Sequence, residues 1–152
     1  MERLSAKDII EKLKLEPLIP EGGWFSQIWY KKGEVSAIYY LLREGEFSEF
    51  HVLPGPEQYF FLMGDPVEHY RGRSGSFTRT VLGQDLTAGQ ELSLRVEGDE
   101  IQGSRLVPGG KWALLSTVMS PAFEMGEYRQ CSGEELQRAF PNQEDLIRTL
   151  TN

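Results

Sequence analysis

The sequence has little cysteine, few histidines and no long apolar run. Cys131 is the single cysteine among 152 residues, which excludes an internal disulfide and favours a reducing, cytoplasmic location. Residues 1–17 are charged and lack the apolar stretch of a secretory signal. No segment has enough consecutive apolar residues to span a bilayer. We therefore expect no membrane partner.

Positive charge is also scarce, with 16 lysines and arginines against 23 aspartates and glutamates and a net charge of -7. Nucleic-acid binding needs a positive stripe, and the basic runs at 30–32 and 71–73 are short and turn-like. We therefore expect no nucleic-acid partner. Hydrophobic residues make up 39% of the chain and aromatic residues 11%, enough for a packed core. The length predicts one domain over residues 1–152.

Helix signals stand at the two ends of the chain. Ser5 and Asp8 have the spacing of a capping box, in which each side chain bonds the backbone of the other residue. This predicts a short helix over about residues 6–13. Ser132, followed three residues later by Glu135, marks a second helix start. We expect closing helices over about residues 132–150, split into 132–140 and 143–149.

The residues between these helices have the composition of strands. Short segments rich in aromatic and β-branched residues alternate with glycine- and proline-containing turns, which is typical of an all-β sandwich or barrel. The barrel is predicted over about residues 24–130. Its predicted strands are 24–30, 36–42, 46–52, 58–63, 67–71, 76–82, 91–96, 100–106 and 112–119.

One segment, residues 45–64, carries the candidate chemistry. Glu57 follows His51 by six residues, and Pro54, Gly55 and Pro56 lie between them. We expect a hairpin here, with both side chains on one face because their separation is even. In the second strand both alternating sets of side chains are largely apolar, so this strand is predicted to be buried on both faces.

The spacing in this segment resembles the first cupin motif. That motif has a glycine, five residues, His-x-His, three or four residues, a glutamate, six residues and a glycine. Gly45, His51, Glu57 and Gly64 fit it, with Leu53 in place of the second histidine. The second cupin motif fits from Pro108, with Ala113 at its histidine position. The resemblance implies a double-stranded β-helix, the cupin jelly-roll barrel, with the helices packed outside.

Further segments resemble one small family of single-domain cupins of unknown function. They are residues 20–25, 36–42, 81–90, 120–123 and 140–141. The family is similar in fold to a metal-free sugar-nucleotide epimerase and is usually dimeric, which implies a homodimer. The chain departs from the family where polar pocket groups are usual, namely at Ser26, Gln27, Tyr30, Val52 and Pro56.

A metal site is the weaker interpretation of His51 and Glu57. The cupin pattern would take ligands from positions 51, 53, 57 and 113, and only two of these hold ligand-type side chains. The other histidine, His69, lies outside the motif. Transition metals need three or four protein ligands. We expect no resident metal and no cofactor, although a metal-dependent enzyme with a degenerate ligand set stays open.

Two metal-free interpretations remain. His51 can act as a general base that Glu57 orients, with Tyr39, Tyr59 or Tyr70 as proton donor, which suits an epimerase or isomerase. Alternatively, the barrel is a non-catalytic binding or sensor module. In both, the expected ligand is a small polar or carbohydrate-like molecule. The pocket is predicted to involve Tyr39, Leu53, Tyr59, Phe61 and Ala113.

Overall fold

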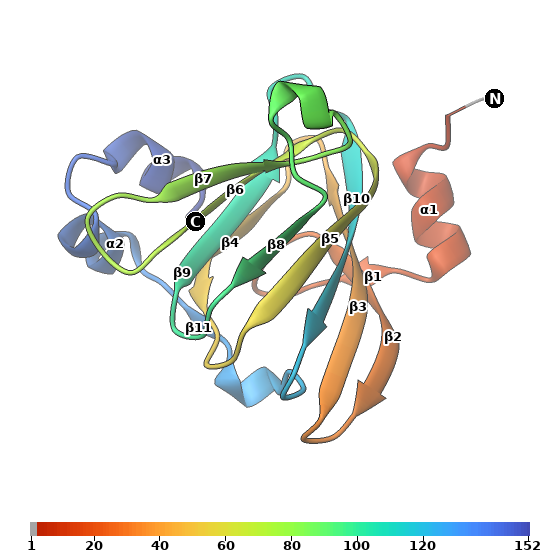
Figure 1. The fold of residues 1–152 in the computed structure, drawn as a ribbon, viewed down its shortest axis with the longest axis horizontal. Helices are drawn as coiled ribbons and strands as arrows, with labels where there is room; N and C mark the ends of the chain where they lie inside the picture. The colour runs from red at the N-terminus through yellow and green to blue at the C-terminus, as the bar shows by residue number, and fades with distance from the viewer. Residues whose placement is uncertain (1–2) are drawn as a thin grey trace.

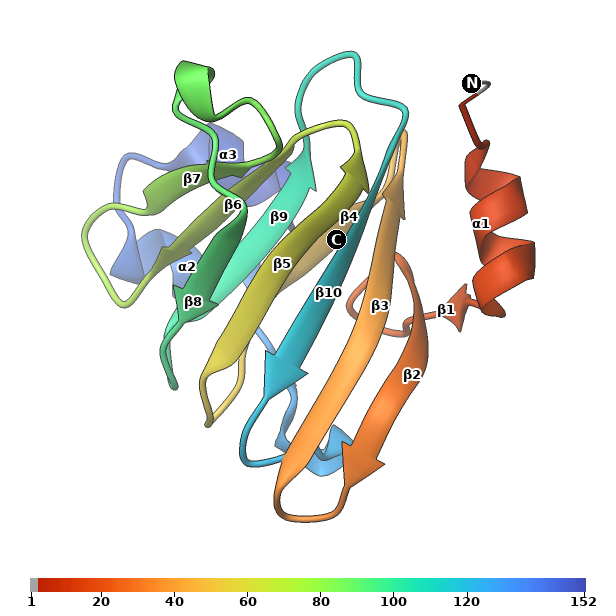
Figure 2. The same cartoon turned by 45° about the vertical axis from the view of Figure 1, so that its right-hand side comes forward.

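The computed structural model describes residues 3–152, and it confirms an all-β jelly-roll barrel of two facing antiparallel sheets (Figures 1 and 2). The first sheet has the strand order β1 (Glu16–Pro17), β2 (Trp24–Lys31), β3 (Val35–Arg43), β10 (Trp112–Met119), β5 (Glu57–Gly64) and β8 (Ser93–Val96). The second has the order β11 (Arg129–Gln130), β4 (Phe47–Val52), β9 (Ile101–Leu106), β6 (Val67–Gly72) and β7 (Thr78–Leu82). Two 3-10 turns, η1 (Leu86–Ala88) and η2 (Met125–Glu127), lie in the connections.

Helix α1 (Ala6–Leu13) matches its predicted range and covers one end of the outward face of the first sheet. The Oγ of Ser5 accepts from the amide of Asp8, and the Asp8 carboxylate accepts from the amide of Ser5, both at 3.1 Å. The capping box therefore forms as the sequence indicates. Ile9 on the apolar side of α1 is buried in a cluster that also contains Leu41, Trp112 and Leu114.

Helices α2 (Gly133–Ala139) and α3 (Glu144–Thr149) cover the outward face of the second sheet, on the opposite side of the barrel from α1 (Figure 1). Ser132 caps α2 by accepting from the amide of Glu135 at 3.1 Å. The apolar side of both helices packs on Phe50 of β4, in a cluster with Leu136, Phe140, Ile147 and Leu150. No helix among residues 3–152 is long and apolar enough to cross a membrane.

The hairpin expected at Pro54–Gly55–Pro56 is wrong, because β4 and β5 belong to different sheets. β4 pairs with β9 and β11, whereas β5 pairs with β10 and β8. The two prolines have no N–H to donate to a strand ladder, and the carbonyl of Leu53, the residue after β4, accepts from the amide of Asp99. The segment therefore carries the chain from one sheet to the other.

The prediction that β5 is buried on both faces is also wrong. Its inward residues Glu57, Tyr59 and Phe61 are buried, but Phe60 on the outward face is 41% exposed and Leu62 is exposed too. Helix α1 packs over the other part of this outward face, beside Trp24, Tyr39, Leu41 and Leu114. An apolar part of the first sheet is thus left open to solvent.

Candidate functional site

A bulge in β4 directs two polar side chains into the barrel. Ser48 lies opposite Ser104 of β9, and His51 lies opposite Gln102. Between these two pairs β4 therefore has one residue more than β9. Because of this extra residue, the side chain of His51 points into the barrel, as that of Ser48 does. Phe50, next to His51, points outward into the cluster beneath α2 and α3.

His51 is only 1% exposed, and its hydrogen bonds define its tautomer. Its Nδ1 lies 2.6 Å from the carbonyl oxygen of Glu49. A carbonyl only accepts, so Nδ1 carries a hydrogen and Nε2 is the basic nitrogen of the neutral ring. Nε2 lies 3.8 Å from Oε1 of Glu21, and the ring stacks on Tyr128 with centroids 5.1 Å apart. The basic nitrogen of His51 therefore faces Glu21.

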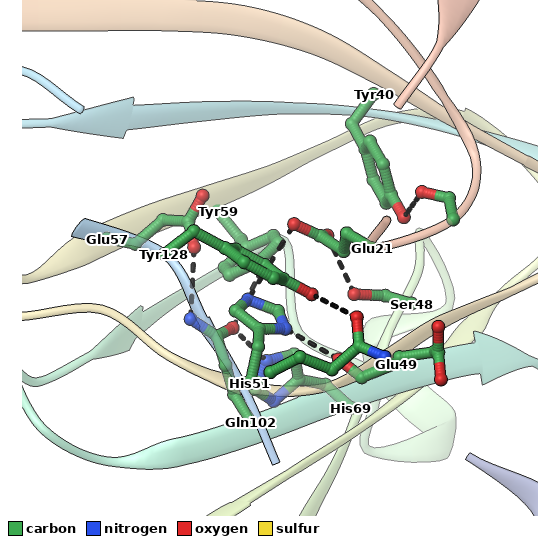
Figure 3. A network of polar contacts seen from close by, with 12 residues as sticks. Glu21, Tyr40, Ser48, Glu49, His51, Glu57, Tyr59, His69, Gln102 and Tyr128 are labelled. Atoms are coloured by element: carbon green, nitrogen blue, oxygen red, sulfur yellow. Dashed lines mark hydrogen bonds and ion pairs between the residues drawn. The ribbon is translucent and has the colours of Figure 1, made fainter. Parts of the chain in front are cut away.

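Glu21 reaches the interior from the loop between β1 and β2. Gly22 and Gly23 in this loop have φ angles of 107° and 79°, which favour glycine. A Cβ at Gly23 would lie 2.6 Å from the hydroxyl of Tyr40, and that hydroxyl donates to the carbonyl of Gly22 at 2.6 Å. The Glu21 carboxylate accepts from the hydroxyl of Ser48 at 2.7 Å. The two glycines let the loop pack closely enough to place Glu21 beside His51 (Figure 3).

Glu57 enters the same interior from β5 of the first sheet, facing β4 and His51 of the second sheet, and is 8% exposed. The amide nitrogen of Gln102 donates to its Oε1 at 3.0 Å. Burial raises the pKa of Glu57, the Glu21 carboxylate raises it further, and a charged His51 opposes this rise. A carboxyl group with a raised pKa keeps its proton to a higher pH than an exposed carboxyl does, which suits it to exchange a proton with a ligand.

The orientation of Gln102 is set by two further donors. Its Oε1 accepts from the hydroxyl of Tyr59 at 2.7 Å and from Nε2 of His69 at 3.0 Å. Because the amide NH₂ donates to Glu57, this oxygen can only accept, and both groups act as donors. His69 thus carries its hydrogen on Nε2, and burial lowers its pKa to about 4, which keeps it neutral at pH 7. Its Nδ1 and the Ser104 hydroxyl have no hydrogen-bond partner among the described residues.

A cavity of about 90 Å³ lies beside these groups. Glu21, Glu57, Thr117 and Tyr128 contribute its polar lining together with Gln27 and Ser36, and the other walls are apolar. The loop residue Ile19 is 75% exposed and Met125 of η2 is 57% exposed, so these two residues mark its mouth. The apolar lining residues are Leu18, Ile19, Pro20, Phe25, Ile38, Leu53, Met119, Phe123 and Met125.

The residues predicted for the site divide into two groups. Glu57 and Leu53 line the cavity. His51 lies behind the cavity wall, against Tyr128 and Glu21. Tyr59 is buried and bonds Gln102. These four residues are therefore brought together, although Glu57 bonds Gln102 and His51 faces Glu21 instead of each other.

The remaining predicted residues lie elsewhere. Phe61 and Ala113 are part of the barrel core and do not line the cavity. Tyr39 points away from the interior and packs in the α1 cluster, because strand alternation gives the inward position to Tyr40. Tyr70 also faces outward, beneath α2 and α3, where its hydroxyl donates to Glu68 at 2.8 Å. Neither Tyr39 nor Tyr70 is placed to donate a proton in the cavity.

Sequence reasoning missed Glu21, Gln102 and Tyr128. Glu21 stands in a Pro-Glu-Gly-Gly segment that predicts a turn, and the pair of glycines after an acidic residue was the available signal. Gln102 is a polar residue in an otherwise ordinary strand, and Tyr128 lies just after η2. Neither of these two has a local signal in the sequence.

The residues at the cupin metal positions do not fit a metal centre. Leu53 presents an apolar side chain to the cavity, and Ala113 is fully buried in the barrel core. Within residues 3–152 no three histidine, cysteine, aspartate or glutamate side chains form a group suited to hold a metal ion.

Comparison with known proteins agrees with this fold. A family model described as Cupin superfamily (DUF985) matches residues 7–130. The chain is similar to protein SO0799 from Shewanella oneidensis, with a TM-score of 0.90 and 29% identity over 99% of each chain. No curated protein matches the sequence.

Two further solved structures are similar in fold alone. A hypothetical protein from Leishmania major has a TM-score of 0.89 and 23% identity, covering 97% of this chain and 99% of its own. The polyketide cyclase RemF from Streptomyces resistomycificus has a TM-score of 0.60 and 13% identity, covering 100% of this chain and 99% of its own.

Proposed function

Because the chain belongs to the DUF985 family of the cupin superfamily, we propose that its barrel binds a small molecule in the cavity and catalyses proton transfer to and from that molecule. One observation carries this proposal. Two carboxylates, Glu21 from the loop between β1 and β2 and Glu57 from β5, line one cavity, and His51 stands behind Glu21. Such an arrangement offers an acid and a base to a single ligand.

The environments of the two carboxylates suggest different roles. Glu57 has a raised pKa and one oxygen held by Gln102, so it is the group that exchanges a proton with the ligand. Glu21 is held by Ser48 and faces the basic nitrogen of His51. In an isomerisation, Glu57 removes a proton from carbon and the Glu21–His51 pair returns one at another position. An epimerisation uses the same groups on opposite faces of one carbon.

The cavity walls favour a less polar ligand than a carbohydrate. Most lining side chains are apolar, including Leu53 at the position where cupins have a histidine. A hydroxyl-rich molecule would leave several polar groups unpaired against these walls, and each costs about 1–3 kcal/mol. A small molecule with an apolar body and one polar end satisfies the lining better.

The proposal is tested by hydrogen exchange with solvent. The protein is incubated in D₂O with a panel of small ketones, aldehydes and amino ketones, and deuterium at carbon is followed by NMR. We expect exchange above the buffer background for at least one compound, and we expect Glu57→Gln to abolish it. The matched control is Asp145→Asn, which removes one charge from a fully exposed side chain of α3 and should leave the rate unchanged.

The non-catalytic binding module is the competing outcome. Saturable binding of panel members without any deuterium incorporation would refute proton transfer and support a binding or sensor role. Exchange that persists in Glu57→Gln would show that the chemistry occurs elsewhere.

A further inference from the structure

The charge of the cavity lining is of one sign. Glu21 and Glu57 are the charged side chains among the described residues that line it, and no lysine or arginine is among them. The chain as a whole carries a net charge of -7. A ligand entering this cavity therefore meets negative charge in a largely apolar, partly enclosed space, where charge interactions are stronger than in water.

Aromatic rings form part of the same lining. Phe25 of β2, Phe123 and Tyr128 all line the cavity. The faces of aromatic rings attract cations, and enclosed rings beside carboxylates are a known way of recognising ammonium groups. The rings and the carboxylates are independent features of the lining, and both favour a positive ligand.

We infer that the cavity takes a small organic cation, namely an ammonium group on a short apolar body. The ammonium lies between Glu21 and Glu57, and the apolar body contacts Phe25 and the other hydrophobic walls. This inference rests on the proposed function only in placing the ligand in this cavity, and it names the ligand class. It replaces the carbohydrate-like ligand expected from the sequence.

Anionic ligands are disfavoured by the same residues. A carboxylate or phosphate would lie next to Glu21 and Glu57 with no lining cation to pair with, and an unpaired desolvated charge is strongly unfavourable. An uncharged alcohol keeps the apolar contacts but loses the charge interaction. The three charge types therefore differ in expected affinity, although their apolar bodies are alike.

The volume limits the size of the enclosed part. An apolar cavity of about 150 Å³ accommodates benzene, whereas this cavity measures about 90 Å³. An ammonium group with a few carbon atoms fits inside. A longer ligand must extend outward past Ile19 and Met125, the exposed residues at the mouth.

The test compares three probes of equal chain length, n-butylammonium, 1-butanol and butyrate, by calorimetric titration of the full chain. We expect n-butylammonium to bind, 1-butanol to bind at least about tenfold more weakly, and butyrate to show no binding. Equal or tighter binding of 1-butanol or butyrate would overturn the inference, as would the absence of binding by n-butylammonium.

Variants locate the effect at the two carboxylates. Glu21→Gln and Glu57→Gln are each expected to weaken n-butylammonium binding by about fivefold or more, while Asp145→Asn leaves it unchanged. Two variants are used so that one remains informative if the other fails to fold, which circular dichroism checks. Unchanged affinity in the folded glutamine variants would contradict the inference.

These titrations involve no turnover, so they separate the inference from the proposed function. Binding of n-butylammonium without deuterium exchange on any panel compound would keep the ligand class and reject the proton transfer. Exchange on neutral carbonyl compounds without ammonium binding would keep the proton transfer and reject the ligand class.

Discussion

Nε2 of His51 lies 3.8 Å from Oε1 of Glu21, so the histidine of the cupin motif faces a carboxylate from outside that motif. Its own Nδ1 is engaged by the carbonyl of Glu49. The ring is therefore fixed in tautomer and direction, and Glu21 is the acidic side chain between its basic nitrogen and the cavity. The chemistry of His51 is expected to depend on Glu21 more than on Glu57.

Replacing Glu21 by glutamine is the direct test of that dependence. Glu21→Gln should lower the rate of deuterium exchange by about 100-fold or more, the usual contribution of a positioned acid or base. The glutamine can still accept from Ser48, so the fold should be kept. The matched control is Glu16→Gln in the exposed strand β1, and a similar loss in this control would show that the effect is not specific to the site.

Glu57 should reduce the stability of the protein at high pH. Its pKa in the folded protein is raised above the ordinary value of 4.5, chiefly by burial. The folded state therefore keeps this proton to a higher pH than the unfolded state, and the resulting stability is lost as pH rises through the folded pKa. We expect Glu57→Gln to unfold a few degrees higher than the parent protein at about pH 8.

The expected gain shrinks on acidification, because Glu57 takes up its proton in the folded protein first and the cost of burying its charge disappears. Thermal unfolding followed by circular dichroism at several pH values measures this. A glutamine variant that is less stable than the parent at high pH would contradict the assignment of Glu57 as a desolvated carboxylate with a raised pKa.

His69 should make the protein sensitive to acid. Burial lowers its pKa to about 4, against 6.5 for an unperturbed histidine. Above about pH 6.5 the His69 ring is neutral in both the folded and the unfolded protein. As pH falls through 6.5 toward 4 the unfolded state gains the proton first, so stability is lost by roughly 3 kcal/mol.

The measurement is urea unfolding over this pH range with His69→Gln as comparison, since glutamine can still donate to Gln102 and does not titrate. The parent protein should lose more stability on acidification than the variant. Parallel pH profiles of the parent and the variant would indicate that His69 is not the responsible group. An NMR titration in which the His69 imidazole itself takes up its proton near pH 6.5 would indicate the same.

Leu53 should limit the size of the cavity. It is buried and lines the wall, so Leu53→Ala should lower the free energy of unfolding by about 2–5 kcal/mol and admit a bulkier cation such as benzylammonium. The control is Leu94→Ala, which is in the barrel core but does not line the cavity. The Leu94→Ala variant should lose comparable stability without gaining affinity for benzylammonium. A gain in this control would contradict the role of Leu53.

A homodimer stays a prediction, and the outward face of the first sheet is where we propose that it forms. Cross-strand neighbours on this face are Tyr39, Ser116 and Phe60 in one row and Ala37, Val118 and Gln58 in the next. These residues are uncharged, in a chain whose net charge of -7 would otherwise oppose self-association. The face is also partly apolar and exposed at Phe60.

Sedimentation velocity tests this interface. Phe60→Glu should shift a dimer toward monomer, because a two-fold interface brings two copies of the new charge close together. Leu86→Glu is the matched control, since Leu86 is exposed in η1. Dissociation by both variants, or by neither, would place the interface elsewhere.

Secondary structure could be predicted well from the sequence because its signals are local. The capping box at Ser5 and Asp8, and the strand-type composition of residues 112–119, act over a few residues, and both elements match their predicted bounds. The pairing of β4 and β5 could not be predicted in this way. Alternation identifies a strand and its faces but not its partners, which lie far along the chain.

The site shows the same division. The spacing of His51 and Glu57 identified two of its residues, because the motif lies within one short segment. The hydrogen-bond partner of Glu57 is Gln102, which follows it by 45 residues. Glu21 comes from a loop that precedes the motif in the sequence. Sequence spacing alone cannot predict contacts that form only when the barrel closes.

The crossing of the chain between sheets has a consequence for folding. β4 must pair with β9 and β5 with β10 before Glu57 and His51 share one interior, so no isolated hairpin can assemble the site. A ligand seated there binds only the closed barrel and stabilises the whole molecule against unfolding. Partly folded chains should have no affinity for it, and ligand affinity thus serves as a readout of cooperative, complete folding.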